Sequence, residues 1–337
     1  MTTSLTRTLR VGTRRSLLAT TQSGHVADLI RAQLGREVEL VEITTEGDLN
    51  SAPLATMGGT GVFVSALRDA LLRGDVDVAV HSLKDLPTTP AEGISLVAVP
   101  VREDPRDVVV ARDGLTLGEL PVGSRVGTGS PRRAAQLEAL GLGVEIVEIR
   151  GNVDTRIAKV RSGDYDAVLL ARAGLARLGR VDEATEVLDP LQMLPAPGQG
   201  ALAIECLTSD AALVDELALL DDHATRASVT AERAVLATLE AGCSAPLGAL
   251  AEVVEGDDGD ELWIRAVVLS PDGGLSIRMS ATGDVDDAAG TGQRLASEML
   301  ADGAADLMSS AARQRGDEVD TVAQSNTVEA PVRKQQS

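Results

Sequence analysis

Short apolar segments alternate with helical stretches from the start of the sequence, and this order limits the possible folds more than any other feature. Residues 9–13 (LRVGT) predict a strand, and apolar residues in the stretch that follows recur on one helical face. Further strands are predicted at residues 38–45, 76–82, 124–128, 144–150 and 166–171, and helices at residues 62–74, from Pro131 and from about Val153. A βαβα order favours an α/β fold with a mostly parallel sheet.

The same rhythm restarts after Pro100, which predicts two α/β domains of similar build. A third region begins at about His223 with a helical run. It continues with a strand at residues 262–270 and ends with a helix near residues 294–308. Residues 313–337 are polar and charged, so we expect a disordered tail there.

The composition excludes several classes of partner. A net charge of −20 opposes general binding to nucleic acid or to an anionic membrane. Only 1% of the residues are aromatic, so no stacking platform for bases is available, and the cores must be built from Leu, Val, Ile and Ala. No apolar run is long enough to span a membrane. Residues 13–18 superficially resemble a twin-arginine export signal, but no apolar segment follows them, so we expect a cytoplasmic protein.

Polar and cationic side chains follow successive predicted strands, where ligands of open α/β sheets bind. These residues are Arg14, Ser16, His81, Lys84, Asp85, Ser130, Arg132, Arg133, Arg150, Arg156, Arg172 and Arg177. Because guanidinium groups pair with carboxylates and phosphates, the set predicts a ligand with several such groups. For any single arginine the alternative is a solvated side chain, or an ion pair with an acid such as Glu138, Glu145 or Asp154.

Three of these positions have more than one interpretation. Ser130 before Pro131 has the pattern of a helix N-cap followed by proline at the first helical position. His81 is expected to be a structural, hydrogen-bonded histidine. Asp85 is either a surface ion pair with Lys84 or the ionised acid of a cationic cleft, where it stabilises a cation or accepts a hydrogen bond from an N–H group.

The chain has two cysteines, Cys206 and Cys243. Cys206 continues an apolar strand and is expected to be buried and inert. Cys243 lies between Gly242 and Ser244 in a turn-forming segment, so it is a half-exposed structural thiol, a nucleophile or a covalent anchor. Three scattered histidines and two distant cysteines predict no metal site.

Seven segments, in order, resemble the porphobilinogen deaminase (hydroxymethylbilane synthase) family. They are HSLKD, REDPRD, GTGSPRR, RGNVDTR, YDAVLLARAGLARLG, LPAPGQGALAIEC and EAGCSAPLG, and the resemblance runs from about Leu9 to about Met308. The family implies a transferase of porphyrin (heme) biosynthesis that joins four porphobilinogen molecules head to tail, releases ammonia and then hydroxymethylbilane. It also implies two domains like type 2 periplasmic binding proteins with a central cleft, and a smaller α/β third domain. We therefore assign residues 1–100 with 200–220 to the first domain, 101–199 to the second and 223–312 to the third.

The resemblance also implies roles for individual residues. Cys243 would hold a dipyrromethane cofactor through a thioether, and Asp85 would be the catalytic carboxylate. Cofactor contacts would come from Lys84, Ser130, Arg132 and Arg133. Substrate contacts would come from Arg14, Ser16, Gln22, Arg150, Arg156, Arg177 and Gln199. We expect a monomer whose partner is the small molecule porphobilinogen, with no nucleic acid and no membrane.

The sequence departs from the family in the loop of residues 46–61, which we call the glycine loop, and other classes of function compete. Glu46 stands where arginine is common, and Thr56 and Thr60 stand where lysines are common, which leaves open how this loop closes on an anionic substrate. The alternatives are a solute-binding protein for a polycarboxylate and a cysteine hydrolase or acyltransferase. The intact mass of the purified protein separates them, because only the deaminase carries an adduct of two pyrrole rings.

Overall fold

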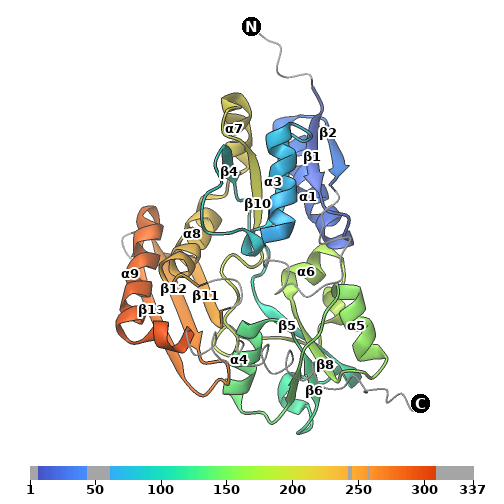
Figure 1. Cartoon of the computed structure of the whole chain (residues 1–337), viewed down its shortest axis with the longest axis vertical. Helices are drawn as coiled ribbons and strands as arrows, with labels where there is room; N and C mark the ends of the chain where they lie inside the picture. The colour runs from blue at the N-terminus through green and yellow to red at the C-terminus, as the bar shows by residue number, and fades with distance from the viewer. Residues whose placement is uncertain (1–6, 44–60, 242–244, 257–258, 309–337) are drawn as a thin grey trace, which may run out of the picture.

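The computed structural model describes residues 7–43, 61–241, 245–256 and 259–308, and these residues form three β-sheets (Figure 1). The first sheet has the order β2-β1-β3-β10-β4. Its strands are β1 (Leu9–Thr13), β2 (Val38–Glu42), β3 (Val78–Ser82), β4 (Ile94–Ala98) and β10 (Leu202–Leu207). The second sheet has the order β7-β6-β8-β5-β9. Its strands are β5 (Asp107–Ala111), β6 (Arg125–Gly127), β7 (Glu145–Val147), β8 (Ala167–Ala171) and β9 (Glu186–Val187).

The expectation of a mostly parallel sheet is confirmed, since in each large sheet four strands run in one direction and only one is reversed. In the first sheet β1 is parallel to β2 and β3, whereas β10 is antiparallel to both β3 and β4. In the second sheet β6 is parallel to β7 and β8, whereas β5 is antiparallel to both β8 and β9. In both cases the reversed strand is the one that the chain forms on arriving from the other domain. Such a strand is not tied to its neighbour by the helical crossover that makes neighbouring strands parallel.

Helices cover these sheets, and those predicted before Gly35, at residues 62–74, from Pro131 and from about Val153 are confirmed. The helices of the first two domains are α1 (Leu17–Leu34), α3 (Gly61–Arg73), α4 (Pro131–Leu140), α5 (Val153–Arg161), α6 (Arg172–Arg177) and α7 (Ala211–Leu217). Ser16 caps α1 by accepting a hydrogen bond from the Ala19 amide, and Ser130 caps α4. Short 3-10 turns lie at Leu83–Asp85 (η1), Arg112–Gly114, Leu117–Glu119, Val181–Glu183, Ala218–Leu220 and Val285–Asp287.

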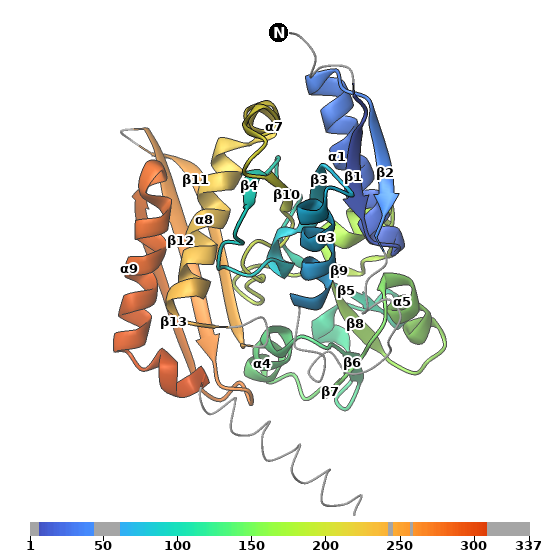
Figure 2. The ribbon, with the colours of Figure 1, turned by 45° about the horizontal axis from the view of Figure 1, so that its top comes forward.

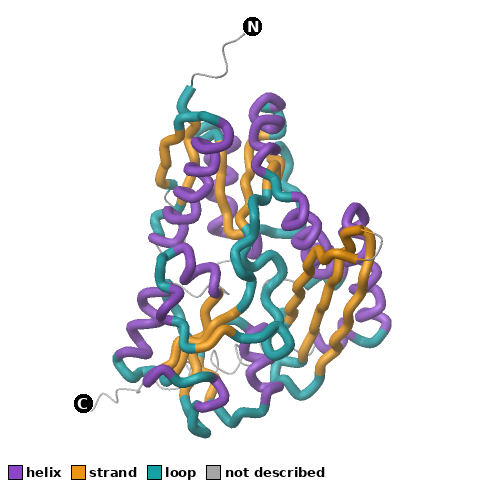
Figure 3. The backbone as a smooth tube through the Cα atoms, turned by 180° about the vertical axis from the view of Figure 1, so that it is seen from behind, coloured by secondary structure: helices purple, strands orange, loops and turns teal. Residues whose placement is uncertain are grey.

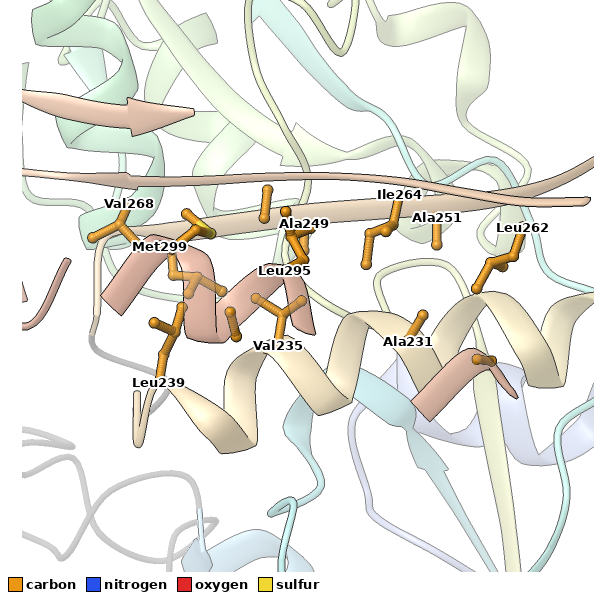
Figure 4. Packing of buried hydrophobic residues seen from close by; sticks show 14 of the residues in the cluster. Ala231, Val235, Leu239, Ala249, Ala251, Leu262, Ile264, Val268, Leu295 and Met299 are labelled. Atoms are coloured by element: carbon orange, nitrogen blue, oxygen red, sulfur yellow. The ribbon is translucent and has the colours of Figure 1, made fainter. Parts of the chain in front are cut away.

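The third sheet has the order β11-β12-β13 and is antiparallel throughout. It consists of β11 (Leu247–Gly256), β12 (Gly259–Leu269) and β13 (Ser276–Asp284), and one face is covered by α8 (His223–Thr238) and α9 (Ala288–Ala301). Figure 4 shows Val235 and Leu239 of α8 and Leu295 of α9 packed beneath Ala249 and Ile264. These small and aliphatic side chains form the core that the aromatic-poor composition requires.

The two five-stranded sheets lie at opposite ends of the long axis, and the third sheet with α8 and α9 stands beside them (Figures 2 and 3). An α/β fold with two similar domains and a smaller third one is therefore confirmed, while the exact domain limits stay predictions. The expected disordered tail lies outside the described residues, as do most of the glycine loop and the segment around Cys243. No helix within the described ranges is long and apolar enough to cross a membrane.

Candidate active site

The turn η1 places Lys84 and Asp85 directly after the buried strand β3. Leu83 anchors the turn, since its side chain is fully buried and its amide donates to the Ala201 carbonyl at 3.0 Å. Gly198 packs against the same turn, and a Cβ built there would lie 3.4 Å from the Lys84 amide nitrogen. Gly198 also has a φ of +74°, a conformation that favours glycine. The position of Asp85 is therefore set by buried contacts on both sides of the turn.

The half-buried Asp85 carboxylate accepts no hydrogen bond from the residues that the structure describes and forms no ion pair with them. The neighbouring ammonium group points elsewhere, because Lys84 Nζ lies 3.2 Å from Gln199 Oε1. The alternative of a surface ion pair between Lys84 and Asp85 is therefore wrong. The carboxylate keeps its full capacity to accept hydrogen bonds from a ligand.

Gln199 connects Lys84 to the buried Asp107, which pairs with two arginines. We call this group the Asp107 cluster (Lys84, Asp107, Arg132, Arg133 and Gln199). The fully buried Asp107 lies 2.8 Å from Arg132 Nη2 and 2.7 Å from Arg133 Nη2, and it accepts a hydrogen bond from Gln199 Nε2 at 2.8 Å. Burial alone would raise the pKa of Asp107, but the two guanidinium groups hold it well below its usual range. The cluster joins the end of β3 to β5 and α4 of the second domain.

Positive charge exceeds negative charge in the Asp107 cluster, because three cations share one carboxylate. Burial and the repulsion of the two arginines lower the pKa of Lys84 to about 8, although Asp85 and Asp107 oppose the shift. The Nε atoms of Arg132 and Arg133 are buried and donate to no partner within the described part of the chain. An acidic ligand would supply the missing negative charge and acceptors.

Two further arginines are half-buried without a carboxylate partner among the described residues. Arg156 Nε donates to the Gly151 carbonyl at 2.8 Å, and burial together with the nearby Arg133 lowers the pKa of Arg156. Arg177 Nη2 donates to the Gly200 carbonyl at 2.6 Å, and burial lowers its pKa to about 10. Both groups extend the region in which an anionic ligand would be stabilised.

The remaining predicted ligand contacts differ in how they are placed. Arg150 is exposed and pairs with Glu148, an acid other than those expected. Gln22 is buried on α1, and Ser16 and the half-buried Arg14 lie at the start of that helix. α1 contacts α6, the helix that ends at Arg177, where Leu18 lies 3.9 Å from a Cβ built at Gly174.

Sequence reasoning missed Asp107 and did not foresee how fully Gln199 is used. Both Gln199 amide hydrogens are occupied, by the Pro105 carbonyl at 2.7 Å and by Asp107 at 2.8 Å, which leaves only its oxygen for a further contact. The available signal was an acid at the start of the apolar run DVVVA, because a buried carboxylate needs cationic partners.

Cys206 is fully buried, as expected, and burial raises the pKa of its thiol to about 11. A thiol of this kind is a weak nucleophile near neutral pH. His81 is also buried, with Nε2 3.2 Å from Glu205 Oε2, in agreement with a structural role. Cys243, Glu46, Thr56 and Thr60 lie outside the described residues.

Together these features define an α/β protein with a cationic site that suits a ligand with several carboxylates. The family model described as "Porphobilinogen deaminase, dipyromethane cofactor binding domain" matches residues 9–215, and "Porphobilinogen deaminase, C-terminal domain" matches residues 227–301. The chain is 62% identical over 314 residues to porphobilinogen deaminase 1 of Streptomyces avermitilis, covering 89% of this chain and 97% of that one. It is 60% identical over 305 residues to the porphobilinogen deaminase of Mycobacterium tuberculosis strain H37Rv, covering 89% and 98%.

Similarity to solved structures is weaker. A periplasmic substrate-binding protein of an ABC transporter from Coxiella burnetii is 14% identical, with a TM-score of 0.40 over 63% of this chain and 91% of that one. A putative methionine-binding lipoprotein from Bacillus subtilis is 12% identical, with a TM-score of 0.39 over 63% and 89%.

The chain belongs to the porphobilinogen deaminase family. It is a transferase of tetrapyrrole biosynthesis that polymerises porphobilinogen on a dipyrromethane cofactor. The solute-binding and cysteine-hydrolase alternatives are therefore set aside.

Proposed function

We propose that Asp85 is the catalytic carboxylate of this polymerisation and that the surrounding cations hold the carboxylates of cofactor and substrate. The observation that carries this proposal is that the Asp85 carboxylate accepts no hydrogen bond from the described residues. Its neighbour in the chain, Lys84, donates to Gln199 of the Asp107 cluster instead. A carboxylate with no such partner can accept hydrogen bonds from the N–H groups of a ligand.

The residues fit the acetate and propionate groups of a dipyrromethane. Arg132 and Arg133 offer buried Nε donors with no partner among the described residues, and the excess positive charge at Lys84 favours an anion. We assign Lys84, Ser130, Arg132 and Arg133 to cofactor binding, with Cys243 as the covalent attachment point. When bound, the dipyrromethane supplies the free pyrrole α-carbon to which the first porphobilinogen is joined.

Each addition breaks the C–N bond of the aminomethyl group of porphobilinogen and forms one C–C bond. Ammonia leaves with the bonding electron pair and takes up one proton, while the free pyrrole α-carbon that attacks the resulting methylene group loses one. As the C–N bond breaks, positive charge develops on the pyrrole nitrogen of the substrate, and the Asp85 carboxylate stabilises it. We assign Arg14, Ser16, Gln22, Arg150, Arg156 and Arg177 to the carboxylates of substrate and growing chain, and Gln199, through its remaining amide oxygen, to a donor group of the substrate.

Asp85→Asn tests the role of the carboxylate, because the amide keeps the size of the side chain but loses its charge. Loss of one preorganised electrostatic group lowers the rate by about 10²–10³-fold. Asp85→Glu keeps the charge and moves it by one methylene, so it should retain measurable turnover. The assay follows porphobilinogen consumption by protein whose cofactor content has been checked by intact mass. An Asp85→Asn enzyme within a few-fold of the parent would contradict the proposal.

Cys243→Ser tests the anchor, with Cys206→Ser as the matched control. A serine hydroxyl is a far weaker nucleophile than a thiol near neutral pH, so Cys243→Ser should fold and carry no adduct. Cys206 is buried with a raised pKa, so Cys206→Ser should keep the adduct. The intact mass of each variant reports the outcome, and an adduct found on Cys206 would refute the assignment.

We also propose that the enzyme is a cytoplasmic monomer. The cysteine content supports the compartment, because two cysteines can form at most one disulfide. Sedimentation analysis of the cofactor-loaded protein tests the oligomeric state, and cell fractionation tests the compartment.

A further inference from the structure

An arginine of the third domain contacts the turn that carries Asp85. Arg233 lies on α8, and its Nη1 donates to the carbonyls of Leu86 at 3.0 Å and Leu83 at 3.5 Å. Its Nη2 donates to the Pro87 carbonyl at 2.6 Å. One guanidinium group thus holds three backbone carbonyls on either side of Asp85. The planar fork of arginine suits this arrangement of several acceptors.

The same face of α8 also packs against the turn through an apolar contact. Val229, one helical turn before Arg233, belongs to a buried cluster with Leu83 and Leu86. Residues four apart on a helix lie on one face, so Val229 and Arg233 form a single contact surface. The turn is therefore fixed against α8 by both a buried apolar contact and a set of hydrogen bonds.

The neighbouring residue Glu232 holds the turn from its other side. Glu232 Oε2 accepts a hydrogen bond from the Gly198 amide at 2.6 Å. Gly198 in turn packs against Leu83 and Lys84. In the sequence, α8 ends at Thr238, five residues before Cys243. One helix thus holds the catalytic turn and leads directly into the segment of the cofactor cysteine.

We propose that Arg233 is a positioning residue for Asp85. It fixes the turn relative to α8, so that the carboxylate keeps one position. The inference rests on the proposed catalytic role of Asp85. Electrostatic stabilisation of the substrate depends on where the carboxylate lies, and a displacement of about 1 Å can lower a rate about 10²-fold. Loss of the guanidinium group should therefore lower kcat more than it raises KM, because no assigned substrate contact lies on the turn itself.

The test compares variants of the cofactor-loaded enzyme, each checked by intact mass. Arg233→Met keeps the apolar stem of the side chain and removes the donors, whereas Arg233→Ala removes both. We expect both to lower kcat about 10- to 100-fold with KM changed by less than about threefold. Arg233→Lys returns N–H donors and should recover part of the loss. If Arg233→Ala does not fold, Arg233→Met decides by the same criterion.

Arg226→Ala is the matched control, since Arg226 lies on the same helix with similar burial but pairs with Asp221 rather than with the turn. We expect its kcat to stay within about twofold of the parent, because the partner of Arg226, Asp221, lies outside the turn of Asp85. A cavity of about 140 Å³ is lined by Arg233, Arg68, Glu205, Leu86 and Pro87. Guanidinium ion at low millimolar concentration should enter this space in Arg233→Ala and raise kcat, with no effect on Arg226→Ala or Asp85→Asn.

Two results would overturn the inference. One is a kcat of Arg233→Met within about threefold of the parent. The other is a loss shared equally by Arg226→Ala, which would indicate general weakening of α8. Asp85→Asn is measured in the same assay to separate the two proposals. If Asp85→Asn keeps its activity, the catalytic role of Asp85 fails. If Asp85→Asn is inactive and Arg233→Met is active, only the positioning role of Arg233 fails.

Discussion

Single residues of the site hold positive charge that the surrounding protein disfavours. Lys84 is the clearest case, because burial and two neighbouring arginines lower its pKa to about 8. Arg177 and Arg156 are shifted in the same direction by burial. A site of this kind has already lost part of the hydration of its cations, so binding of a carboxylate restores favourable interactions that water no longer provides.

Affinity for an acidic pyrrole should therefore depend on pH near the pKa of Lys84. Below about 8 the ammonium group is charged and binds a carboxylate, and as the pH rises through about 8 the charge is lost. In cofactor-free Cys243→Ser protein, where the cofactor contacts of Lys84 are open to a free pyrrole, we expect porphobilinogen binding at this site to weaken about tenfold between pH about 7 and pH about 9. Calorimetry at these pH values measures the effect and should also detect proton uptake on binding at the higher pH.

Lys84→Arg is the control for this pH dependence, since arginine stays charged over the whole range. Its affinity should change much less between the two pH values. Equal weakening in the parent and in Lys84→Arg would show that another group, such as the amine of porphobilinogen, is responsible.

At the scale of elements, glycines mark where helices come too close for a side chain and where they do not. A Cβ built at Gly292 of α9 would lie 2.3 Å from the Ala231 carbonyl oxygen of α8. A Cβ built at Gly24 of α1 meets nothing within 4 Å. The close approach of α8 and α9 therefore depends on Gly292, whereas no close contact of α1 requires a glycine at position 24.

Alanine substitutions at these two glycines should have opposite effects. Gly292→Ala forces α9 away from α8 and should destabilise the third domain by about 1–3 kcal/mol. Gly24→Ala should stabilise α1 by about 0.5–1 kcal/mol, because alanine loses less backbone entropy than glycine in a helix. Urea unfolding followed by circular dichroism measures both, and fluorescence of the single tryptophan, Trp263 in β12, reports on the third domain. An unchanged midpoint for Gly292→Ala would contradict the packing argument.

At the scale of the whole molecule, one buried carboxylate connects the third domain to both chain segments that pass between the two large sheets. The fully buried Glu232 accepts from Arg102 Nη1 at 2.6 Å, from Gly198 N at 2.6 Å and from Ala251 N at 2.9 Å. Arg102 lies on the outgoing segment, Gly198 on the returning one and Ala251 on β11. The relative placement of the domains therefore depends on this residue.

Glu232→Gln should destabilise the protein by about 3–5 kcal/mol, because it leaves the guanidinium group of Arg102 buried without a counter-charge. In urea, the unfolding transition of the third domain, measured by Trp263 fluorescence, should then no longer coincide with the transition of the rest of the protein, measured by circular dichroism. Glu252→Gln is the control, since Glu252 is largely exposed and lies 3.8 Å from Arg265, and it should change stability by less than about 0.5 kcal/mol. A cost of Glu232→Gln no larger than that of the control would refute the junction role.

The family motifs and most of the elements could be predicted from the sequence, because both depend on residues close together in the chain. The strand at residues 9–13 coincides with β1, and Ser130 with Pro131 begins α4 as expected. Apolar periodicity and capping act over a few residues, so no tertiary contact is needed to recognise them. The candidate site residues were found for the same reason, since they follow strands and lie in short motifs.

Only the tertiary structure decided how these parts combine. The direction of β5 and β10 depends on the path of the chain between domains, and the pairing of Arg132 and Arg133 with Asp107 joins residues about 25 positions apart. The contact of Arg233 with the turn of Asp85 spans almost half the chain. Local sequence carries no record of such partners, because the free energy of a buried charge or carbonyl depends on which groups the fold brings to it.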